Sequence, residues 1–192
     1  MSERREELTR VAARLFAEHG YQGTSLADLA DALGVQKPSL YHHIASKEDL
    51  LWEVAWEGAE AFHAGLDRVP DGIPATERIR LALRAHLAVV GRQLDVATVF
   101  VREWRHLSDE RRERFLVERR RYEDRIRELF ADGVAGSELR TDLDVPTAAL
   151  LFLSTANWAY TWLRPGSDTD TLADRMFAAL LDGMRGYSTP SA

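Results

Sequence analysis

The chain has 192 residues, of which 45% are hydrophobic and 29% are charged, and it contains no cysteine. This composition excludes a disordered or collagen-like chain, and the missing thiols exclude a disulfide scaffold, a thiolate zinc site, an iron–sulfur cluster and a cysteine nucleophile. Asp and Glu outnumber Lys and Arg by 31 to 25, and the resulting net charge of −6 argues against a simple nucleic-acid binder.

Helical periodicity dominates the first third of the chain. An apolar stripe predicts an amphipathic helix that ends near Gly20, with the positions Leu8, Val11, Ala12, Leu15 and Phe16. Ser25 and Asp28 form a capping pair at the start of a short helix that runs to Leu33. A second short helix is expected at roughly 38–44. The sequence Ser46-Lys47-Glu48-Asp49 then indicates another capping box, which opens a longer helix to about residue 66.

The remaining two thirds of the chain is also predicted to be helical. Pro and Gly residues at 70–74 break the pattern, and helices follow near 75–91, 95–106, 109–133, 145–163 and 169–186. No convincing strand is present. We therefore expect an all-α protein of about nine helices. Residues 1–47 are expected to form a small three-helix unit, and residues 48–192 a larger helical bundle.

The strongest functional signal is the pair of short helices joined by a tight turn at Gly34. Glycine suits this turn because it adopts positive φ without a Cβ clash. The second helix exposes the polar side chains that a major-groove reader needs, namely Gln36, Lys37, Ser39, Tyr41 and His42. Lys47 adds a positive charge beside free backbone N–H groups at the start of the next helix. A plain helical bundle with glycine in a turn is the competing interpretation.

The segment from Gly34 to Leu51, together with Thr24 and Asp28-Leu29-Ala30, resembles the N-terminal signature of TetR-family repressors, with some dozen positions matching in order across 8–51. The resemblance implies that this segment reads operator DNA through the matching positions Thr24, Gln36, Lys37, Ser39, Tyr41, His42 and Lys47. Two residues depart from the pattern. Gln36 stands where Ser often caps the recognition helix, at a cost of about 1 kcal/mol, and Ile44 replaces the usual Phe.

Residues 1–47 hold six basic and six acidic residues, so local geometry must provide what the net charge does not. We expect Arg4, Arg5, Lys37 and Lys47 to face phosphates. One copy of residues 1–47, here called a reading head, covers too few base pairs for useful specificity. We therefore also expect a homodimer, built from 145–163 and 169–186. The apolar positions predicted for that interface are Leu172, Met176, Ala179, Leu180 and Met184, with Ala149, Phe152, Leu153 and Ala156.

The C-terminal part carries a weaker resemblance. Residues 99–130 and 157–166 are similar to the TetR subgroup that responds to acyl-CoA thioesters, which implies a repressor released from a palindromic operator by such a ligand. A thioester of this kind needs an apolar tunnel, cationic groups and an aromatic surface. The candidate residues are Phe100, Arg102, Trp104, Arg105, Phe152, Asn157, Trp158, Trp162 and Arg164. Alternatively, the aromatic residues fill the core, or the protein is a TetR-type sensor of drugs or other hydrophobic ligands.

An enzymatic alternative is a carboxylate-bridged di-iron bundle, suggested by the Glu-x-x-His pairs Glu60–His63 and Glu103–His106. With 16 Glu and six His in the chain, two such pairs are unremarkable by chance, and they leave the helix-turn-helix unexplained. We therefore expect no enzymatic activity, no metal and no cofactor. The apolar runs are far shorter than the ~20 residues of a membrane helix, and the N-terminus lacks a secretory pattern, so we expect a cytoplasmic protein without a membrane partner.

Overall fold

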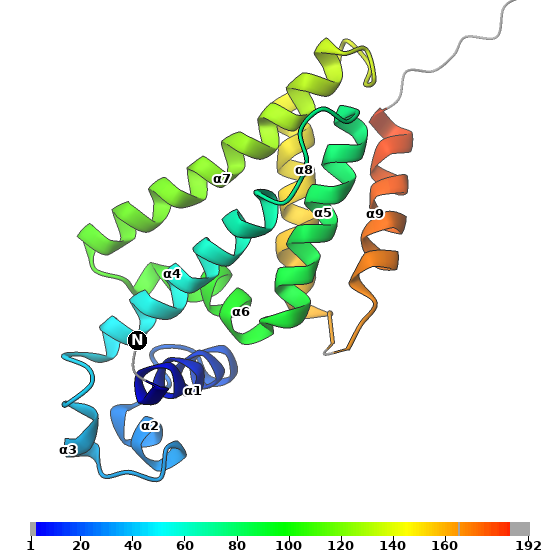
Figure 1. Cartoon of the computed structure of the whole chain (residues 1–192). Coiled ribbons are helices and arrows are strands. Elements are labelled where there is room, and N and C mark those ends of the chain that lie inside the picture. The colour runs from blue at the N-terminus through cyan, green and yellow to red at the C-terminus, as the bar shows by residue number, and fades with distance from the viewer. Residues whose placement is uncertain (1–2, 165, 185–192) are drawn as a thin grey trace, which may run out of the picture. The chain divides into compact units, whose positions relative to one another are not determined.

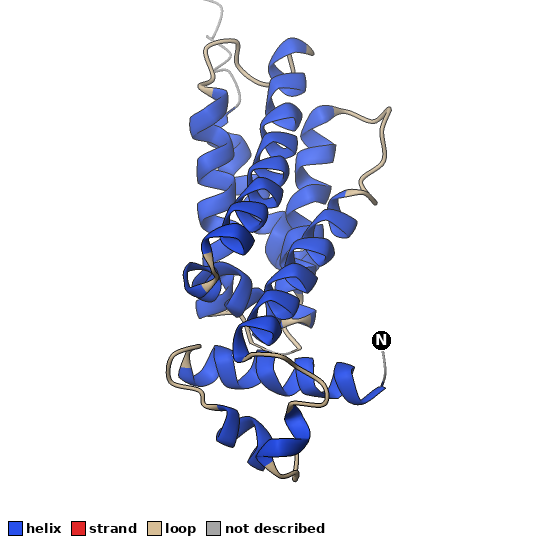
Figure 2. Ribbon diagram, turned by 90° about the vertical axis from the view of Figure 1, so that its left-hand side faces the viewer, coloured by secondary structure: helices blue, strands red, loops and turns tan. Residues whose placement is uncertain are grey.

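The computed structural model describes residues 3–164 and 166–184. Within these residues the chain forms nine α-helices and two short 3₁₀ helices, without a strand (Figures 1 and 2). The prediction of an all-α fold with about nine helices is confirmed. No helix in the described ranges has the length and apolar character that crossing a membrane requires.

The α-helices have the bounds α1 Glu3–His19, α2 Leu26–Ala32, α3 Lys37–Leu40, α4 Lys47–Leu66, α5 Ala75–Arg92, α6 Leu94–Arg102, α7 Asp109–Ala135, α8 Val145–Asn157 and α9 Thr169–Met184. The 3₁₀ helices η1 Glu103–His106 and η2 Trp158–Thr161 extend α6 and α8. The helices expected at 95–106 and 145–163 therefore tighten at their C-terminal ends, as helix termini often do. The second reading helix, expected at 38–44, is shorter than predicted and continues as turns.

The chain divides into two compact units. The first unit comprises Met1–Ala61 and Gln93–Arg119, and the second comprises Phe62–Arg92 and Arg120–Ala192. Both α4 and α7 begin in the first unit and end in the second. The first unit extends beyond residue 47 because α1 packs against α6. The functional boundary between 1–47 and 48–192 stays a prediction.

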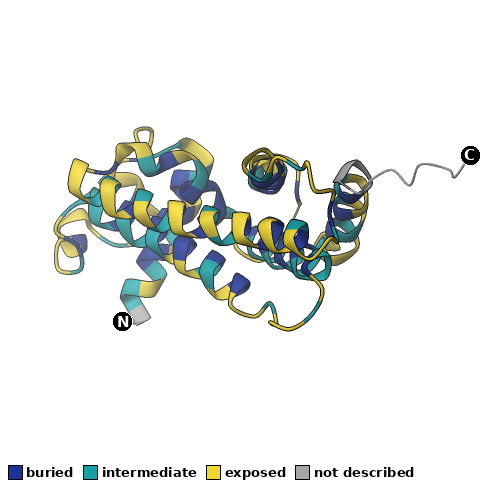
Figure 3. Cartoon of the chain, turned by 90° about the horizontal axis from the view of Figure 1, so that it is seen from above, coloured by how far each residue is buried: buried dark blue, intermediate teal, exposed yellow. Residues whose placement is uncertain are grey.

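The first unit is built on the predicted apolar stripe of α1. Leu8, Ala12 and Phe16 are at most 1% exposed. The other buried apolar residues of this part of the chain are Leu29, Ala30, Leu40, Ile44, Leu50, Leu51 and Val54. Gly34 has a φ of +65°, which confirms the left-handed turn predicted between α2 and α3. Figure 3 shows the buried residues along one side of the helices and the exposed residues along the other.

Both predicted capping boxes are present. The Ser25 hydroxyl accepts the Asp28 N–H at 3.2 Å, and the Asp28 carboxylate accepts the Ser25 N–H at 2.7 Å. At the start of α4, the Ser46 hydroxyl accepts the Asp49 N–H at 3.1 Å and the Asp49 carboxylate accepts the Ser46 N–H at 2.8 Å. Each box satisfies backbone donors that a helix N-terminus otherwise leaves unpaired. Local sequence therefore fixes where α2 and α4 begin.

The second unit is centred on α5, which contacts α8, α9 and η2 (Figure 1). Phe130 and Phe152 meet edge to face, with ring centroids 6.1 Å apart. The Asp174 carboxylate of α9 accepts hydrogen bonds from Arg80 and Arg84 of α5. These hydrogen bonds lower the pKa of Asp174 to about 2. An apolar core and an ionic clamp at its edge thus hold α9 against α5.

Candidate DNA interface and effector-binding residues

The candidate DNA-reading surface is α3 with the turn that follows it. Five of the residues predicted to contact DNA are exposed on this segment, namely Gln36, Lys37, Ser39, Tyr41 and His42. Tyr41 is a large side chain with 53% of its surface exposed. Gln36 occupies the N-cap of α3 without making a side-chain cap bond to any described residue, and Pro38 supports the first turn of the helix. The segment presents donors and acceptors suited to base edges and phosphates.

Thr24 lies inside the fold. Its side chain is 1% exposed, and its hydroxyl donates to the carbonyls of Leu15 at 3.1 Å and Gly20 at 2.9 Å. This hydroxyl joins the end of α1 to the segment that precedes α2. The DNA contact expected of Thr24 stays a prediction.

Lys47 is also engaged inside the first unit. Its ammonium group donates to the carbonyl of Tyr21 at 2.8 Å and to that of Thr24 at 2.7 Å, and it lies 4.1 Å from the ring centroid of Tyr21. Desolvation lowers the pKa of Lys47, with Asp28 acting in the opposite direction. In this structure the cation anchors α4 to the turn between α1 and α2, and the phosphate contact expected of Lys47 stays a prediction.

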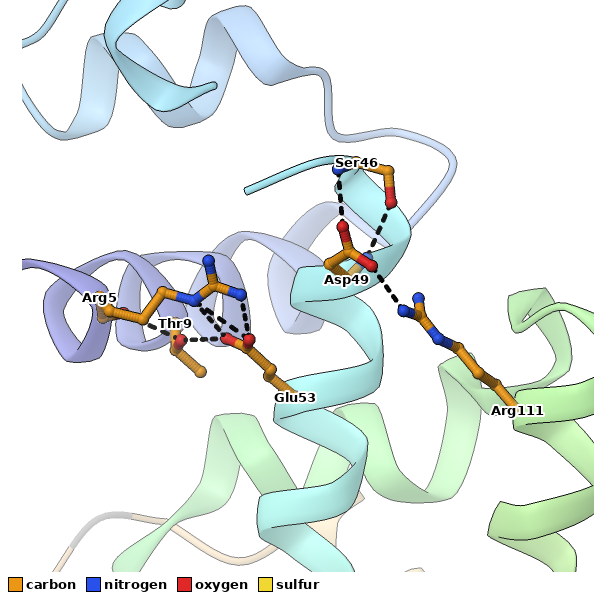
Figure 4. Close-up of polar contacts among 6 residues, drawn as sticks. All are labelled: Arg5, Thr9, Ser46, Asp49, Glu53 and Arg111. Atoms are coloured by element: carbon orange, nitrogen blue, oxygen red, sulfur yellow. Dashed lines mark hydrogen bonds and ion pairs between the residues drawn. The ribbon is translucent and has the colours of Figure 1, made fainter. Parts of the chain in front are cut away.

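Two of the arginines expected to face phosphates form ion pairs. The Arg5 guanidinium donates to both carboxylate oxygens of Glu53, and Thr9 donates to the same carboxylate at 3.1 Å (Figure 4). Arg4 pairs with Glu7 at 2.6 Å within α1. Of the four cations in that prediction, Lys37 is the one that stands exposed on the reading segment. Arg4 and Arg5 are thus paired with carboxylates in this structure, and the phosphate contacts expected of them stay predictions.

Residues of η1 also contact the turn between α1 and α2. The buried Glu103 carboxylate accepts the backbone N–H of Tyr21 at 3.0 Å. The His106 ring stacks on the Tyr21 ring with a centroid separation of 5.5 Å. The Glu103–His106 pair thus has a structural role in the first unit. Among the described residues, no group of three or more His, Asp or Glu side chains could hold a metal ion.

The nine residues predicted to bind the effector fall into both units. In the first unit, Phe100 is buried, Trp104 is half-buried, and Arg102 and Arg105 are exposed. Trp104 stacks on Phe115 with a centroid separation of 6.1 Å. The guanidinium groups of Arg105 and Arg119 lie 4.7 and 5.5 Å from its ring centroid. The indole N–H of Trp104 is buried and has no hydrogen-bond partner among the described residues.

In the second unit, some of the predicted effector residues are buried in the core and others are exposed on the surface. Phe152 is fully buried, whereas Trp158 is 61% exposed and Trp162 is 43% exposed. Asn157 is half-buried and Arg164 is exposed. The two tryptophans are therefore surface residues, and Phe152 packs in the core against Phe130.

The second unit contains a buried polar pair that was not predicted from the sequence. His86 of α5 is 2% exposed, and its Nδ1 lies 3.1 Å from the hydroxyl of Tyr122 on α7. The Nε2 atom is buried without a hydrogen-bond partner among the described residues. Desolvation lowers the pKa of His86 to about 3, and it raises the pKa of Tyr122. The available signal was a histidine within an apolar stripe, between Leu83 and Leu87.

The predicted dimer face on α8 requires a correction. Ala149, Phe152, Leu153 and Ala156 are at most 9% exposed, because they pack inside their own unit. The neighbouring Leu150 and Leu151 are instead 63% and 50% exposed. On α9, Ala179 is exposed and Leu172, Met176 and Leu180 are half-buried, while the side chain of Met184 lies outside the described residues. A groove of about 280 Å³ is lined by Arg140, Leu143, Asp144, Thr147, Ala148, Leu151, Ala179 and Leu180.

Comparison with known families agrees with this arrangement. Residues 8–54 match the model of bacterial regulatory proteins, tetR family, and residues 72–184 match that of the tetracyclin repressor-like C-terminal domain. The chain belongs to the TetR family. It is a helix-turn-helix transcriptional repressor of this type, which confirms the resemblance seen in the sequence.

Relatives match this TetR-family chain along most of its length. The HTH-type transcriptional repressor KstR2 of Rhodococcus jostii is 31% identical over 190 residues, which cover 95% of this chain and 92% of that protein. The structure of the ketosteroid transcriptional regulator KstR2 of Mycobacterium tuberculosis aligns with a TM-score of 0.90 and 25% identity, covering 97% of each chain. AibR in complex with isovaleryl coenzyme A and operator DNA aligns with a TM-score of 0.84 and 31% identity, covering 93% of this chain and 98% of AibR.

Proposed function

We propose that the protein is a transcriptional repressor that binds a palindromic operator as a homodimer and is released by a small amphipathic effector, an acyl-CoA thioester. The observation that carries the proposal is the exposed reading segment after Gly34, with its base-reading and phosphate-binding side chains on one short element. The similarity to AibR, whose structure contains isovaleryl coenzyme A and operator DNA, supports the choice of effector class.

Within the DNA interface, we assign Gln36 and Lys37 to base edges and Ser39, Tyr41 and His42 to phosphates or adjacent bases. Thr24 and Lys47 act by holding the reading segment in place. Because Arg4 and Arg5 are paired with carboxylates, the electrostatic attraction between one reading head and the phosphate backbone is weak. Useful affinity therefore depends on two heads bound side by side.

The homodimer is assigned to α8 and α9, as in the sequence prediction but with a different face. Leu150 and Leu151 are large apolar side chains exposed on α8, and Trp158 follows them on η2. The apolar groove beside Leu151 would receive side chains of a second copy of this chain. A two-fold contact of this kind places half-sites of the operator ~34–36 Å apart as an inverted repeat.

For the effector, each unit supplies aromatic and cationic groups of the required kinds. Trp104 offers an unpaired indole N–H beside Arg105, and Arg102 and Phe100 lie on the same segment. Trp158, Trp162 and Arg164 offer exposed aromatic and cationic surface near Asn157, while Phe152 lies in the apolar core of the same unit. Aromatic rings suit an adenine, and guanidinium groups suit phosphates. Taken for each unit by itself, these residues are our proposed effector contacts.

Release requires that the effector bind the DNA-incompetent state more tightly than the DNA-competent one. The first turns of α4 are the element that would transmit the change. Asp49 pairs with Arg111 of α7, and Glu53 pairs with Arg5 of α1 (Figure 4). Lys47 holds the turn before α2. A shift of α4 would therefore move α1 and the reading helices with it, and would change the separation of two reading heads.

The DNA-binding part is tested by selecting duplexes from a random pool with the full-length protein. We expect an inverted repeat with half-site centres about one helical turn apart. The double substitution Gln36→Ala/Lys37→Ala should change the selected sequence. Replacing Glu110 and Glu113, which lie on α7 outside the reading segment, by Ala should leave the selected sequence unchanged. Recovery of unrelated sequences by the wild type would contradict the proposal.

The effector is tested by calorimetry against C2 to C18 acyl-CoAs, with Trp158→Ala and Arg164→Ala as variants. We expect wild-type binding at one chain length or a narrow range of them, and weaker binding by both variants. If no acyl-CoA binds but a neutral or cationic drug does, the protein is a multidrug-type sensor and the acyl-CoA assignment is wrong.

A further inference from the structure

The His86–Tyr122 pair is a polar site in the core of the second unit. Its flanking positions on the same helices are apolar and buried, with Leu83 and Leu87 on α5 and Ile126 on α7 each fully buried. The Phe62 ring covers the imidazole with a centroid separation of 4.5 Å. A leucine at position 86 would continue the apolar stripe of α5. Packing alone therefore does not account for a histidine here.

One ring nitrogen of His86 has no hydrogen-bond partner among the described residues. Nδ1 is hydrogen-bonded to the Tyr122 hydroxyl, while Nε2 is buried and unpaired among the described residues. A buried polar atom without a partner destabilises the folded state, and such atoms are uncommon in native interiors. An unpaired atom in a ligand-responsive domain is accounted for if its partner is the ligand.

Both members of the pair are electrically neutral at neutral pH. Burial disfavours the imidazolium form of His86 and the phenolate form of Tyr122. When the phenol O–H donates to Nδ1, Nε2 carries the hydrogen and is a donor. In the other tautomer, Nδ1–H donates to the phenol oxygen and Nε2 is an acceptor. Either form presents one uncharged hydrogen-bonding atom to a low-dielectric interior.

The charged residues Arg125 and Asp67 are linked to the Tyr122 side of the pair through His63. The His63 ring meets the Tyr122 ring at a centroid separation of 5.6 Å, and Arg125 lies 3.5 Å from His63 Nδ1. Arg125 is itself paired with Asp67 at 2.8 Å. These groups are half-buried or exposed, whereas Nε2 of His86 is fully enclosed. A chain of polar contacts thus runs from the exposed Asp67 to the buried, uncharged imidazole of His86.

We propose that His86, oriented by Tyr122, recognises an uncharged oxygen function, a keto or hydroxyl group, on the apolar part of the effector. This inference rests on the proposed function, and it adds a chemical requirement to the ligand. A keto oxygen accepts from Nε2–H, and a hydroxyl group donates to Nε2 in the other tautomer. A plain alkyl chain leaves Nε2 unpaired, and the site selects against it for that reason.

The test compares ligands that differ by one oxygen. Wild-type protein with ¹⁵N-labelled histidine is titrated with decanoyl-CoA, with its 3-, 5-, 7- and 9-oxo derivatives, and with the neutral pair 2-decalone and decalin. We expect one oxo probe to bind about tenfold more tightly than its parent, and we expect the ring nitrogen signals of His86 to move. The preference should fall to about unity in both His86→Leu and Tyr122→Phe.

His63→Leu is the matched control, because His63 contacts the same Tyr122 ring from the half-buried side. This variant should keep the preference for the oxo probe. Thermal melting establishes that each variant is folded. A preference that persists in both His86→Leu and Tyr122→Phe would overturn the inference, and so would unchanged His86 signals with every probe.

Operator binding measured on the same samples distinguishes a failure of the role proposed for His86 from a failure of the proposed repressor function. If a probe releases the wild type from its operator while the oxo preference is absent, the repressor function stands and the role of His86 is wrong. If the wild type binds no operator, the proposed function itself fails, and this inference fails with it.

Discussion

The ammonium group of Lys47 lies 4.1 Å from the ring centroid of Tyr21 and donates a 2.8 Å hydrogen bond to the backbone carbonyl of the same residue. The backbone N–H of Tyr21 donates to Glu103 of η1. Tyr21 is therefore held by α4 and by η1 at once. In the first unit, a displacement of either element would reach the turn that precedes α2.

Replacing Lys47 by Met should lower the free energy of unfolding by about 1–2 kcal/mol, because a cation–π contact and two charge-assisted hydrogen bonds are lost. Replacing the exposed Lys37 by Met should leave the melting temperature nearly unchanged. It should instead weaken operator binding and reduce its salt dependence by about one unit of slope. Thermal melts and binding at several salt concentrations check both variants. Equal losses of stability would contradict the distinction drawn between the two lysines.

The pair Arg5–Glu53 should contribute measurably to stability because it is about three-quarters buried and joins α1 to α4. A double-mutant cycle with Arg5→Gln and Glu53→Gln should give a coupling energy of about 1 kcal/mol in urea denaturation. The same cycle on Arg4 and Glu7, whose side chains are 41% and 45% exposed, should give under about 0.5 kcal/mol. A larger coupling for the exposed pair would count against this account.

His86 should make the protein acid-sensitive well above the range in which carboxylates titrate. Its pKa in the folded state, about 3, is lower than the ordinary 6.5, so the unfolded chain binds the proton more readily. Its contribution is complete above pH 7 and is lost as the pH falls from about 6.5 toward 3. Between pH 7 and pH 5 the loss should be about 2 kcal/mol.

Urea denaturation at these two pH values, compared between wild type and His86→Leu, measures this difference. Groups that titrate alike in both proteins cancel in this comparison, so the difference reports His86. The variant should lose less stability than the wild type on going to pH 5. Equal losses in the two proteins would show that His86 is not the titrating group.

The proposed dimer face should be sensitive to charge at two leucines. Leu150→Glu/Leu151→Glu should convert the protein to a monomer at micromolar concentration while the secondary structure is retained, because both side chains are exposed in the protomer. Val117→Glu on α7 is the matched control, since Val117 is 47% exposed and lies outside α8 and α9. Light scattering coupled to size exclusion reports the mass. A double variant that remains dimeric would exclude this face.

Local sequence predicted most of the helix-turn-helix. The capping pairs Ser25–Asp28 and Ser46–Asp49 and the turn at Gly34 depend on residues three or four positions apart, so their spacing alone carries the signal. The partner of Lys47 could not be predicted in this way. The carbonyls that receive its hydrogen bonds lie 23 and 26 positions earlier in the chain, and only the folded unit brings them to it.

The C-terminal part was less predictable for a related reason. Residues 148–153 are all apolar, so periodicity could not decide which side of α8 faces the core. The structure buries Phe152 and exposes Leu150. The pairing of His86 with Tyr122 spans 36 positions between α5 and α7, and it depends on how those helices pack. Residue type alone identified neither relationship.

The most direct test of the central claim is a fluorescence anisotropy titration of the selected operator duplex with the full-length protein, followed by addition of the acyl-CoA series. We expect binding of two protomers per duplex, a loss of affinity with added salt, and release by one acyl-CoA but not by free coenzyme A. Equal affinity for a scrambled duplex, or an operator complex that no member of the series releases, would contradict the claim that this protein is an acyl-CoA-released repressor.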